Sequence, residues 1–459
     1  MARAAGTEPN ESFYVRSFEA CPLFDGNGGA YACASSKNGV GAFRGFSGIL
    51  GSTTPWIDTV GFLDKGDTLY LCGTFLSTSR DYAGAMFNPP TPLAGILGEP
   101  IVIDGDCSAQ GDLTEAVIDA QQSEDLGIQV GGAYSIWQHF HLKNTKSTAI
   151  SSSFTQEPPG ATFRHLKITD IGVGTAAGQN CLELNFSSYL VDDVQIGPCG
   201  NDGIFIGNGS TGMHQGEILN STITGVSAHL STGDGIQEEP GGGGVTIRNV
   251  RVTKRGTDKA CILIGGPNGP AIIDGLDCSA EPGHGPFGGV TIDGAATGSY
   301  MRKAHIHDIP GGTGLFIRDA AAPIAGSLDL YENLIENTGI GVLLGGAHPA
   351  AAIKFHDNTL AGLTRYGIYA LSNWNPGAYT QRNNVIESSG YQVYVDPTPP
   401  GAATDWDSDY NIFKGSGTYF YLSQNYATLS AYASASGDEA HSQSADASPP
   451  APPKGLLIR

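Results

Sequence analysis

The sequence has few charged residues, fewer basic ones, and no long apolar run. Only 15% of its 459 residues are charged, and 24 Lys and Arg stand against 45 Asp and Glu, for a formal charge of −21. Such an acidic surface repels nucleic acid and anionic membranes, so we expect neither as a partner. No stretch of about 18 apolar residues occurs, so we expect no transmembrane helix. The low charge content also makes long amphipathic helices scarce.

The cysteine pattern lacks any CxxC or Cys/His finger spacing, which argues against a zinc finger. The eight cysteines are even in number and widely spaced, which is typical of disulfides formed in an oxidising compartment. Spacing leaves their connectivity open. We expect neighbours to pair, as Cys21–Cys33, Cys72–Cys107, Cys181–Cys199 and Cys261–Cys278. The start MARAAGTEPNES shows no signal peptide and is typical of a mature N-terminus after an added Met, so we expect a secreted protein.

Glycine is abundant, with 66 residues, and short apolar runs are bounded by Gly, Asn, Asp and Ser, as in strands and turns. Aligned on the preceding turn, the first inward apolar residues recur over nine intervals from 150 to 393, a mean of 27 residues. The aligned residues are Ile150, Leu182, Ile204, Ile236, Ile262, Val290, Leu315, Ile340, Ile368 and Val393.

A second strand lies within each interval, and in several of them a polar residue stands three positions before the last apolar residue. These polar residues are His165, Asp193, Asn220, Asn249, Asp357 and Asn383. A polar side chain there can bond the turn backbone and stack on its counterpart in the next coil. Asn333 is expected in the same ladder, with a structural role.

Ten coils of about 27 residues, mostly strand and turn, resemble the right-handed parallel β-helix of the pectin-lyase-like superfamily. The resemblance covers roughly residues 65–420 and implies an all-β solenoid of about ten or more coils in a carbohydrate-active protein. We expect an N-terminal capping segment (1–60), the parallel β-helix (61–420) and a C-terminal irregular tail (421–459).

Two successive coils, GNDGIFIGNG at 200–209 and TGDGIQEEPG at 232–241, carry an Asp at the same point, before Gly and Ile. No other coil has a carboxylate there. Stacked one rung apart, Asp202 and Asp234 would have Cα atoms about 5 Å apart. Like charges that close raise one pKa, which suits an acid and base pair. The alternative is that both residues only form turns.

Further polar and aromatic residues are expected on the same outer face. Glu238 falls at a nominally inward position, so either a bulge turns it outward or its strand ends at Gln237. The candidate catalytic residues are Asp202, Asp234, Glu239 and Glu238. The candidate substrate-binding residues are Glu183, Asn185, Gln237, Lys259, Asp293, Arg318, Tyr369 and Trp374. Trp374 lies in SNWNPGAYT (372–380), the best candidate loop for a sugar platform.

The placement of the two Asp residues is similar to that in polygalacturonase-type β-helix hydrolases, which carry Asp on consecutive coils. This sequence has no double Asp, no GHG on the next coil, which reads KACILIGG, and no RIK. The resemblance therefore implies only carboxylate chemistry on adjacent coils.

Three functions remain open. The first is a secreted glycoside hydrolase acting on a mostly neutral polysaccharide without a cofactor. In it Asp234 or Glu239 is the acid and Asp202 the base or nucleophile, or these roles are exchanged. The second is a calcium-dependent polysaccharide lyase, with Lys254, Lys259 or Arg318 as base and Asp202, Asp234 and Glu238 as Ca²⁺ ligands. The third is a carbohydrate-binding or structural β-helix without catalysis. The oligomeric state is left open.

Two pairs of histidines have the spacing of residues that share one face of a strand. They are His305 and His307 in AHIHDI, and His139 and His141 in WQHFH. A metal site is conceivable at either pair, and decoration of a turn is the alternative. We expect no metal in the catalytic site of a hydrolase.

Overall fold

The chain forms two compact units, which are described separately here. Unit 1 comprises Met1–Thr222 and Ala228–Leu230, and unit 2 comprises Ile223–Ser227 and Ser231–Arg459. The computed structural model describes residues 10–17, 19–21, 30–33, 42–46, 63, 65–80, 84–87, 94–152, 159–172, 180–207, 215–227, 233–239, 243–257, 259–266, 268–285, 287–318, 324, 326–396, 406–422 and 424–445.

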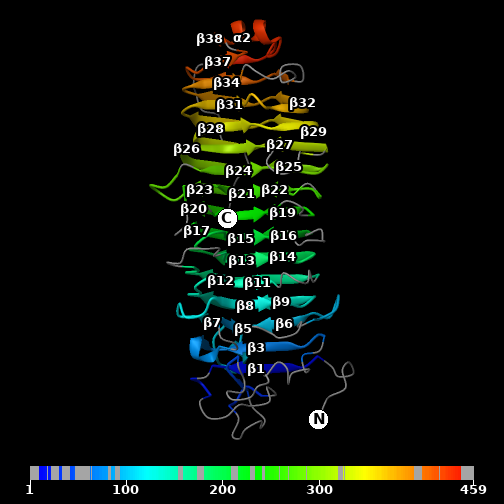
Figure 1. The fold of residues 1–459 in the computed structure, drawn as a ribbon, viewed down its shortest axis with the longest axis vertical. Coiled ribbons are helices and arrows are strands. Elements are labelled where there is room, and N and C mark those ends of the chain that lie inside the picture. Colours follow the sequence, from blue (N-terminus) through cyan, green and yellow to red (C-terminus); the bar gives the residue numbers. More distant parts are fainter. Residues whose placement is uncertain are drawn as a thin grey trace. The chain divides into compact units, whose positions relative to one another are not determined.

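In unit 1 the chain passes repeatedly through three positions, and strands in successive passes pair in parallel to form three stacks (Figure 1). The first stack is β5 (Ala85–Phe87), β8 (Leu126–Val130), β11 (Ile150–Ser152), β13 (Leu182–Leu184) and β15 (Ile204–Ile206). The second is β1 (Ser12–Arg16), β3 (Thr68–Cys72), β6 (Ile101–Asp104), β9 (Ser135–Gln138), the first halves of β12 (Ala161–Thr169) and β14 (Ser188–Ile196), and β16 (Gln215–Leu219). The third is β4 (Thr74–Leu76), β7 (Ala116–Asp119), β10 (Phe140–Lys143) and the second halves of β12 and β14. The two-residue strand β2 (Phe43–Arg44) pairs with β1, and short 3₁₀ turns cover Ser77–Ser79 and Ser108–Gln110.

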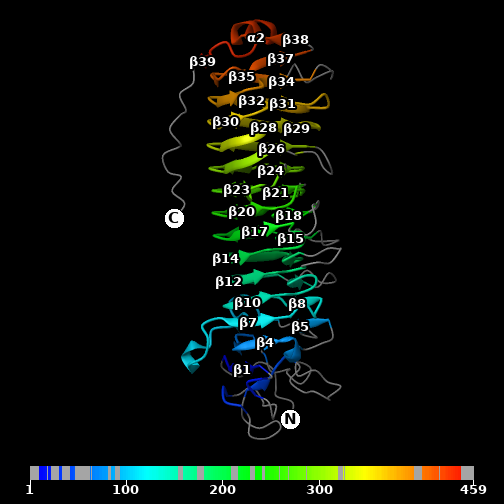
Figure 2. The same cartoon turned by 90° about the vertical axis from the view of Figure 1, so that its left-hand side faces the viewer.

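Unit 2 repeats the three-stack arrangement in its own strands (Figure 2). Its first stack is β18 (Ile236–Glu238), β21 (Ala260–Ile264), β24 (Gly288–Ile292), the ends of β26 (His305–Ile317) and β28 (Leu334–Leu344), β31 (Tyr366–Ala370), β34 (Tyr391–Val395) and β37 (Thr418–Tyr421). Its second is β19 (Val245–Arg248), β22 (Ile272–Asp274), β25 (Ser299–Arg302), β27 (Gly326–Tyr331), β29 (Ala347–His356), β32 (Asn375–Arg382) and β35 (Trp406–Asp409). Its third is β17 (Thr222–Val226), β20 (Arg251–Lys254), β23 (Asp277–Ala280), the starts of β26 and β28, β30 (Thr359–Leu363), β33 (Val385–Ser388), β36 (Ile412–Lys414) and β39 (Gln443–Ala445). An antiparallel β38 (Gln424–Tyr426) and one helix, α2 (Leu429–Ser436), follow β37.

The predicted fold class is confirmed: the chain is an all-β parallel solenoid of about 12 turns spaced by about 27 residues. Among the described residues, no helix has the length and apolar character needed to cross a membrane.

Part of the predicted capping segment joins the second stack, because β1 pairs with β3. Trp56 and most of residues 1–60 lie outside the described residues, as do residues 446–459 of the predicted tail. The three domain boundaries stay predictions.

The inward alignment predicted from the sequence is confirmed in unit 2 from Ile236 to Leu315, whose strands pair in that register. It is wrong at the next coil, where Leu315 pairs with Val342 and the predicted Ile340 pairs with Thr313. The stretch GIGVLL holds two glycines, and the second of them, Gly341, is the one that stands before the inward residue.

Where a glycine stands before the inward residue, the next coil lies close to it. A Cβ on Gly235 would lie 2.4 Å from the carbonyl oxygen of Cys261, and one on Gly341 would lie 2.7 Å from that of Gly367. Carbon and oxygen atoms do not approach that closely without strain, so a larger residue at Gly235 or Gly341 would force the two coils apart locally. This explains Gly235 in the second of the two Asp-Gly-Ile segments found in the sequence.

The predicted polar ladder exists, but its buried members stand one position further along the chain. All six predicted residues have left-handed backbone angles, with φ between 48° and 57°. In unit 2 the residue that follows is the one that enters the interior: Asn358 follows Asp357, and Asn384 follows Asn383. Asn333, Asn358, Asn384 and Asn411 form a continuous buried chain of side-chain hydrogen bonds, each 2.9–3.0 Å long.

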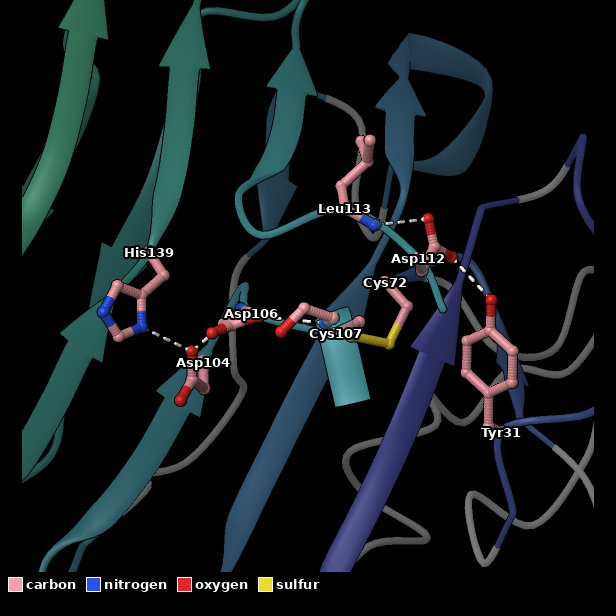
Figure 3. Close-up of a disulfide and its surroundings, with 9 residues drawn as sticks. Tyr31, Cys72, Asp104, Asp106, Cys107, Asp112, Leu113 and His139 are labelled. Atoms are coloured by element: carbon pink, nitrogen blue, oxygen red, sulfur yellow. Dashed lines mark hydrogen bonds and ion pairs between the residues drawn. A yellow bond between two sulfur atoms is a disulfide. The ribbon is translucent and has the colours of Figure 1, made fainter. Parts of the chain in front are cut away.

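The four disulfides join the neighbouring cysteines, as predicted. Figure 3 shows the bond between Cys72 and Cys107 in unit 1, with Asp106 and Asp112 on the loop around it. The Oδ2 atom of Asp112 accepts a 2.7 Å hydrogen bond from Tyr31. Four disulfides are compatible with an oxidising compartment, and secretion stays a prediction.

We predict that Asn384→Ala destabilises unit 2 by about 3 kcal/mol or more, because buried groups left without partners cost about 1–3 kcal/mol each. The Asn384 amide accepts from the backbone and side chain of Asn358 and donates to Phe355 and Asn411. The matched control is Asn383→Gly, at an exposed position with φ 57° that glycine adopts without strain. Denaturant unfolding of both variants checks this, and equal losses of stability would contradict it.

Candidate functional site

A pocket lies on the outer face of the first stack of unit 2. It is lined by Asp234, Lys259, Ala260, Leu263, Gly288, Thr291, Thr313, Phe316, Arg318 and Leu343. Four of these, Leu263, Thr291, Phe316 and Leu343, are register partners on successive coils. Each directly follows a fully buried inward residue, and because side chains alternate along a strand, all four face outward.

Asp234 forms one wall of this pocket, immediately before β18. The residue is fully buried, and its Oδ1 accepts a 2.6 Å hydrogen bond from the backbone N–H of Ala260 on the next coil. Burial raises the pKa of the Asp234 carboxyl to about 6, although the Ala260 bond and the charges of Lys254, Lys259 and Arg318 oppose the shift. A carboxyl group with this pKa is partly protonated near neutral pH, as a proton donor must be.

Lys254 fixes the turn that carries Asp234. Its side chain is fully buried, and its Nζ donates a 2.7 Å hydrogen bond to the carbonyl of Gly233. The ammonium also lies 5.2 Å from the centre of the Phe287 ring. Ser227 completes the turn, since its hydroxyl accepts from the Gly233 N–H at 3.0 Å. Lys254 therefore does not face the pocket, which argues against its predicted role as the base of a lyase.

Two other predicted residues, Arg318 and Asp293, form a two-pronged ion pair beside the pocket. The Arg318 Nε and NH2 groups donate to the two carboxylate oxygens of Asp293, the second bond being 2.8 Å long. The Asp293 side chain is only 7% exposed, whereas that of Arg318 is 37% exposed. The side-chain bond to Asp293 raises the pKa of Arg318 further above its usual value. Lys259, which is exposed, adds a second cation to the pocket.

Glu238 is inside unit 2, and neither sequence-based alternative for it is correct. The strand β18 continues through Glu238 without a bulge, and the residue is 1% exposed and pairs with Ile264. Among the described residues, neither carboxyl oxygen makes a well-formed hydrogen bond. Burial raises its pKa to about 8, against a weaker opposing effect of the Gly244 and Gly266 backbone. Glu238 does not line the pocket, so its position does not suit the catalytic role predicted from the sequence.

The two residues beside Glu238 face the other way. Gln237 is half-buried and is the register partner of Leu263, so it belongs to the outward row of the pocket. Its amide nitrogen contacts the carboxylate of Glu239, which is also half-buried. Both residues are thus placed on the predicted outer face, although neither lines the pocket itself.

Three predicted site residues belong to unit 1. Glu183 on β13 accepts hydrogen bonds from Thr148, Ser151 and Asn180 at 2.8–3.2 Å and is 9% exposed. Asn185 is 2% exposed, and its backbone N–H donates to the Ser152 hydroxyl at 2.6 Å. Asp202 is 2% exposed and accepts from the Asn201 side chain at 3.1 Å. Because Asp202 and Asp234 lie in different units, their adjacency stays a prediction.

The outward row that lines the pocket continues into aromatic residues. Leu343 pairs with Tyr369, Tyr369 with Tyr394, and Tyr394 with Phe420. Tyr394 and Phe420 are stacked, with ring centres 4.2 Å apart. Tyr369 is half-buried and was predicted as a substrate-binding residue. From Leu263 to Tyr394 the row spans five coil spacings, or about 24 Å.

Trp374 is not a sugar platform. It is fully buried and packs edge-on against His348 and Tyr379, with ring centres 5.6 and 6.0 Å away. Tyr379 is buried as well. The segment SNWNPGAYT looks like an exposed loop because of its Asn, Pro and Gly, but β32 begins at Asn375 and both aromatic rings pack inside unit 2.

The two histidine pairs differ in their surroundings. His139 Nδ1 bonds Asp104 at 2.8 Å, as Figure 3 shows, whereas His141 Nε2 bonds Thr169. Within the described residues, one set of three carboxylate and imidazole groups is close enough to share an ion: Asp277, His305 and His307. The calcium set expected for a lyase stays a prediction, with Glu238 pointing into the interior.

Sequence reasoning missed several lining residues, although the signal was present. Leu263, Thr291 and Thr313 are ordinary residues that carry no chemistry-bearing group, so none was selected. The rule that would have found the first two is strand alternation: the residue after each inward apolar position faces outward. Applied to the ten aligned coils, it also yields Phe316, Tyr369 and Tyr394.

Comparisons with known proteins identify no family for this chain. No family model and no curated protein matches it. Among solved structures, it is similar to a mannuronic-acid-specific polysaccharide family 6 lyase from human gut microbiota, with 12% identity, 86% of this chain and 88% of that chain covered, and a TM-score of 0.45. A lacto-N-biosidase of glycoside hydrolase family 136 from Eubacterium ramulus gives 11% identity, 90% and 68% coverage, and a TM-score of 0.47. An alginate lyase from Paenibacillus has 13% identity, 78% of this chain and 94% of that chain covered, and a TM-score of 0.32. Similarities this distant say nothing about the function of this chain, so any proposal about its function has to be based on the residues of the site.

We predict that Glu238 makes the protein less stable as pH rises from about 5 to about 8. Its pKa is about 8 in the fold against an ordinary 4.5, so in this window the folded state binds the extra proton and raising the pH favours unfolding. The expected slope is about 1.4 kcal/mol per pH unit. Urea unfolding at several pH values should show this slope in the wild type and in Glu239→Gln, and a flatter one in Glu238→Gln. Parallel curves for all three proteins would contradict it.

Proposed function

We propose that this protein is a polysaccharide-degrading enzyme, a glycoside hydrolase in which Asp234 donates the proton to the glycosidic oxygen. The observation that carries the proposal is a fully buried carboxyl group with a pKa raised to about 6 at the wall of an outward-facing pocket. Glycoside hydrolysis needs one carboxyl group that is still protonated at working pH, and burial is the usual way to obtain it.

The outer face of the first stack suits a chain of sugars. Phe316 lines the pocket, and Tyr369, Tyr394 and Phe420 continue in the same outward row. Aromatic faces provide large apolar contact area with little loss of conformational entropy, which favours binding of flat sugar surfaces. A row of about 24 Å is long enough for several sugar units, which fits a polymer better than a monosaccharide.

In the proposed reaction, the proton of Asp234 passes to the leaving oxygen while the bond from that oxygen to the sugar C1 breaks. If the configuration is inverted, water adds its hydroxyl to C1 and gives its proton to a second carboxylate. If it is retained, that carboxylate bonds to C1, and water then displaces it and gives its proton to Asp234, which restores the acid. The sequence-based candidate for this second carboxylate, Asp202 in unit 1, stays a prediction. Lys254 acts as a positioning residue, because its bond to Gly233 holds the turn before Asp234.

A polysaccharide lyase is the second candidate, favoured by one observation. Lys259 and Arg318 line the same pocket as Asp234, so two cations could hold the carboxylate of an acidic sugar. Of the predicted bases, Lys259 in its neutral form would then remove the C5 proton while the C4–O4 bond breaks and the leaving oxygen takes a proton from Asp234, so that the product carries a C4–C5 double bond. Arg318, whose pKa is raised by its bond to Asp293, suits holding the sugar carboxylate better than removing the proton. A binding or structural β-helix remains the third alternative, in which no product forms.

We predict that Asp234→Asn lowers kcat on the polysaccharide substrate by about 10²–10⁴-fold with little change in KM, because it removes the proton donor and keeps the shape of the pocket. The measurement is product analysis on a panel of neutral and uronic polysaccharides, following reducing ends and absorbance near 235 nm together, with and without EDTA. The matched control is Asp329→Asn, a half-exposed carboxylate on the second stack of unit 2.

The hydrolase is supported if the wild type and Asp329→Asn release new reducing ends without absorbance near 235 nm and Asp234→Asn does not. Absorbance that EDTA abolishes overturns it in favour of the lyase. Binding to a polysaccharide without any product overturns both enzymatic candidates.

A further inference from the structure

We propose that Asp277, His305 and His307 form a binding site for a divalent transition-metal ion, zinc above all, on the third stack of unit 2. One potential ligand atom from each residue lies within 4.8 Å of the other two. The proposal rests on these residues alone and does not depend on the proposed function.

The coil register brings the three residues together from separate parts of the chain. Asp277 on β23 is the register partner of His305 on β26, and His307 lies two residues further on the same strand. The two imidazole rings therefore share a face, and they stack with centres 4.0 Å apart. The third stack carries this cluster, whereas the first stack carries the pocket.

The chemistry of the cluster suits an ion that prefers nitrogen and oxygen ligands. Two imidazoles and one carboxylate are typical ligands of zinc, which leaves a fourth position open. Glu336 on β28 is not part of the set that can share an ion, and its Oε1 lies 2.8 Å from the Nε2 of His305. Calcium would need more oxygen ligands than the cluster offers.

The surroundings already hold the ligands in place, as in metal sites whose ligands are oriented by outer groups. His307 Nδ1 lies 2.8 Å from Asp308 Oδ2, which leaves the Nε2 directed at Asp277, 3.0 Å away. The second oxygen of Asp277 accepts from Arg251 Nε at 3.0 Å. Asp308 is held in turn by the Asn337 amide at 2.9 Å.

Binding requires only a small contraction of side chains. Atoms around a tetrahedral zinc ion lie about 2.0–2.1 Å from the metal and hence about 3.4 Å from one another. The imidazoles are each 21% exposed and the Asp277 side chain 13% exposed, so an ion can enter from solvent. A bound ion would tie together the two coils that carry β23 and β26.

The test is zinc binding by the full-length protein after EDTA treatment, measured by equilibrium dialysis against buffered ZnCl₂ and metal analysis. We expect one tightly held zinc ion per chain in the wild type. His305→Ala and His307→Ala should each weaken this binding more than 10-fold. Asp308→Asn should weaken it about 10-fold, because it removes an orienting group and keeps every ligand.

The chain offers a matched control in His356. Like His307, it lies between two carboxylates, at 2.8 Å from Asp329 and 2.7 Å from Asp357, and its side chain is half-buried. Within the described residues, His356 does not belong to any group of three ligands close enough to share an ion. His356→Ala should therefore bind zinc as the wild type does.

The proposal is overturned if the wild type holds no zinc, if His307→Ala binds like the wild type, or if His356→Ala loses zinc equally. Circular dichroism checks that each variant folds. Should both His305→Ala and His307→Ala unfold, Co²⁺ added to the wild type decides: a visible absorption band that zinc displaces supports direct coordination, and its absence contradicts it.

Discussion

The parallel pairing of each coil with the next is the constraint on which the other features depend. The coils lie closest where a glycine stands before the inward residue, as at Gly235, Gly289, Gly314, Gly341 and Gly367, because the carbonyl of the following coil occupies the space of a Cβ there. A shift of one residue would place a side chain there and would also turn the apolar side chains outward. The register therefore determines which residues, one coil apart in sequence, form a row.

Rows with different chemistry follow from this one constraint. Inside unit 2, the row of Asn333, Asn358, Asn384 and Asn411 satisfies buried backbone and side-chain groups with amides. On the outer face of the first stack, one row passes from the pocket to Tyr369 and Tyr394. On the third stack, the same pairing sets Asp277 beside His305. The raised pKa values of the Asp234 and Glu238 carboxyl groups also follow from their positions, since both groups are buried.

The fold could be predicted from the sequence because a 27-residue period is a repeated signal, and errors at single coils average out. The one register error arose where two glycines, Gly339 and Gly341, compete for the same position. The position of one side chain is predicted from its own coil alone, so an error there is not corrected by the other coils. Trp374 stands in a polar, loop-like segment yet is buried, and Glu238 keeps its strand position although a buried carboxylate is costly. Asp277 was missed because it is paired with His305 by the register of the third stack. The sequence alignment used only the inward residues of the first stack.

The most direct test of the central claim, that Asp234 is the proton donor of a glycan-cleaving pocket, is the pH dependence of kcat/KM for release of reducing ends. The account predicts that the rate falls above about pH 6, as Asp234 loses its proton, and that the residual rate of Asp234→Asn lacks this limb. A wild-type rate that stays constant from pH 5 to 8, or an unchanged limb in the variant, would contradict it.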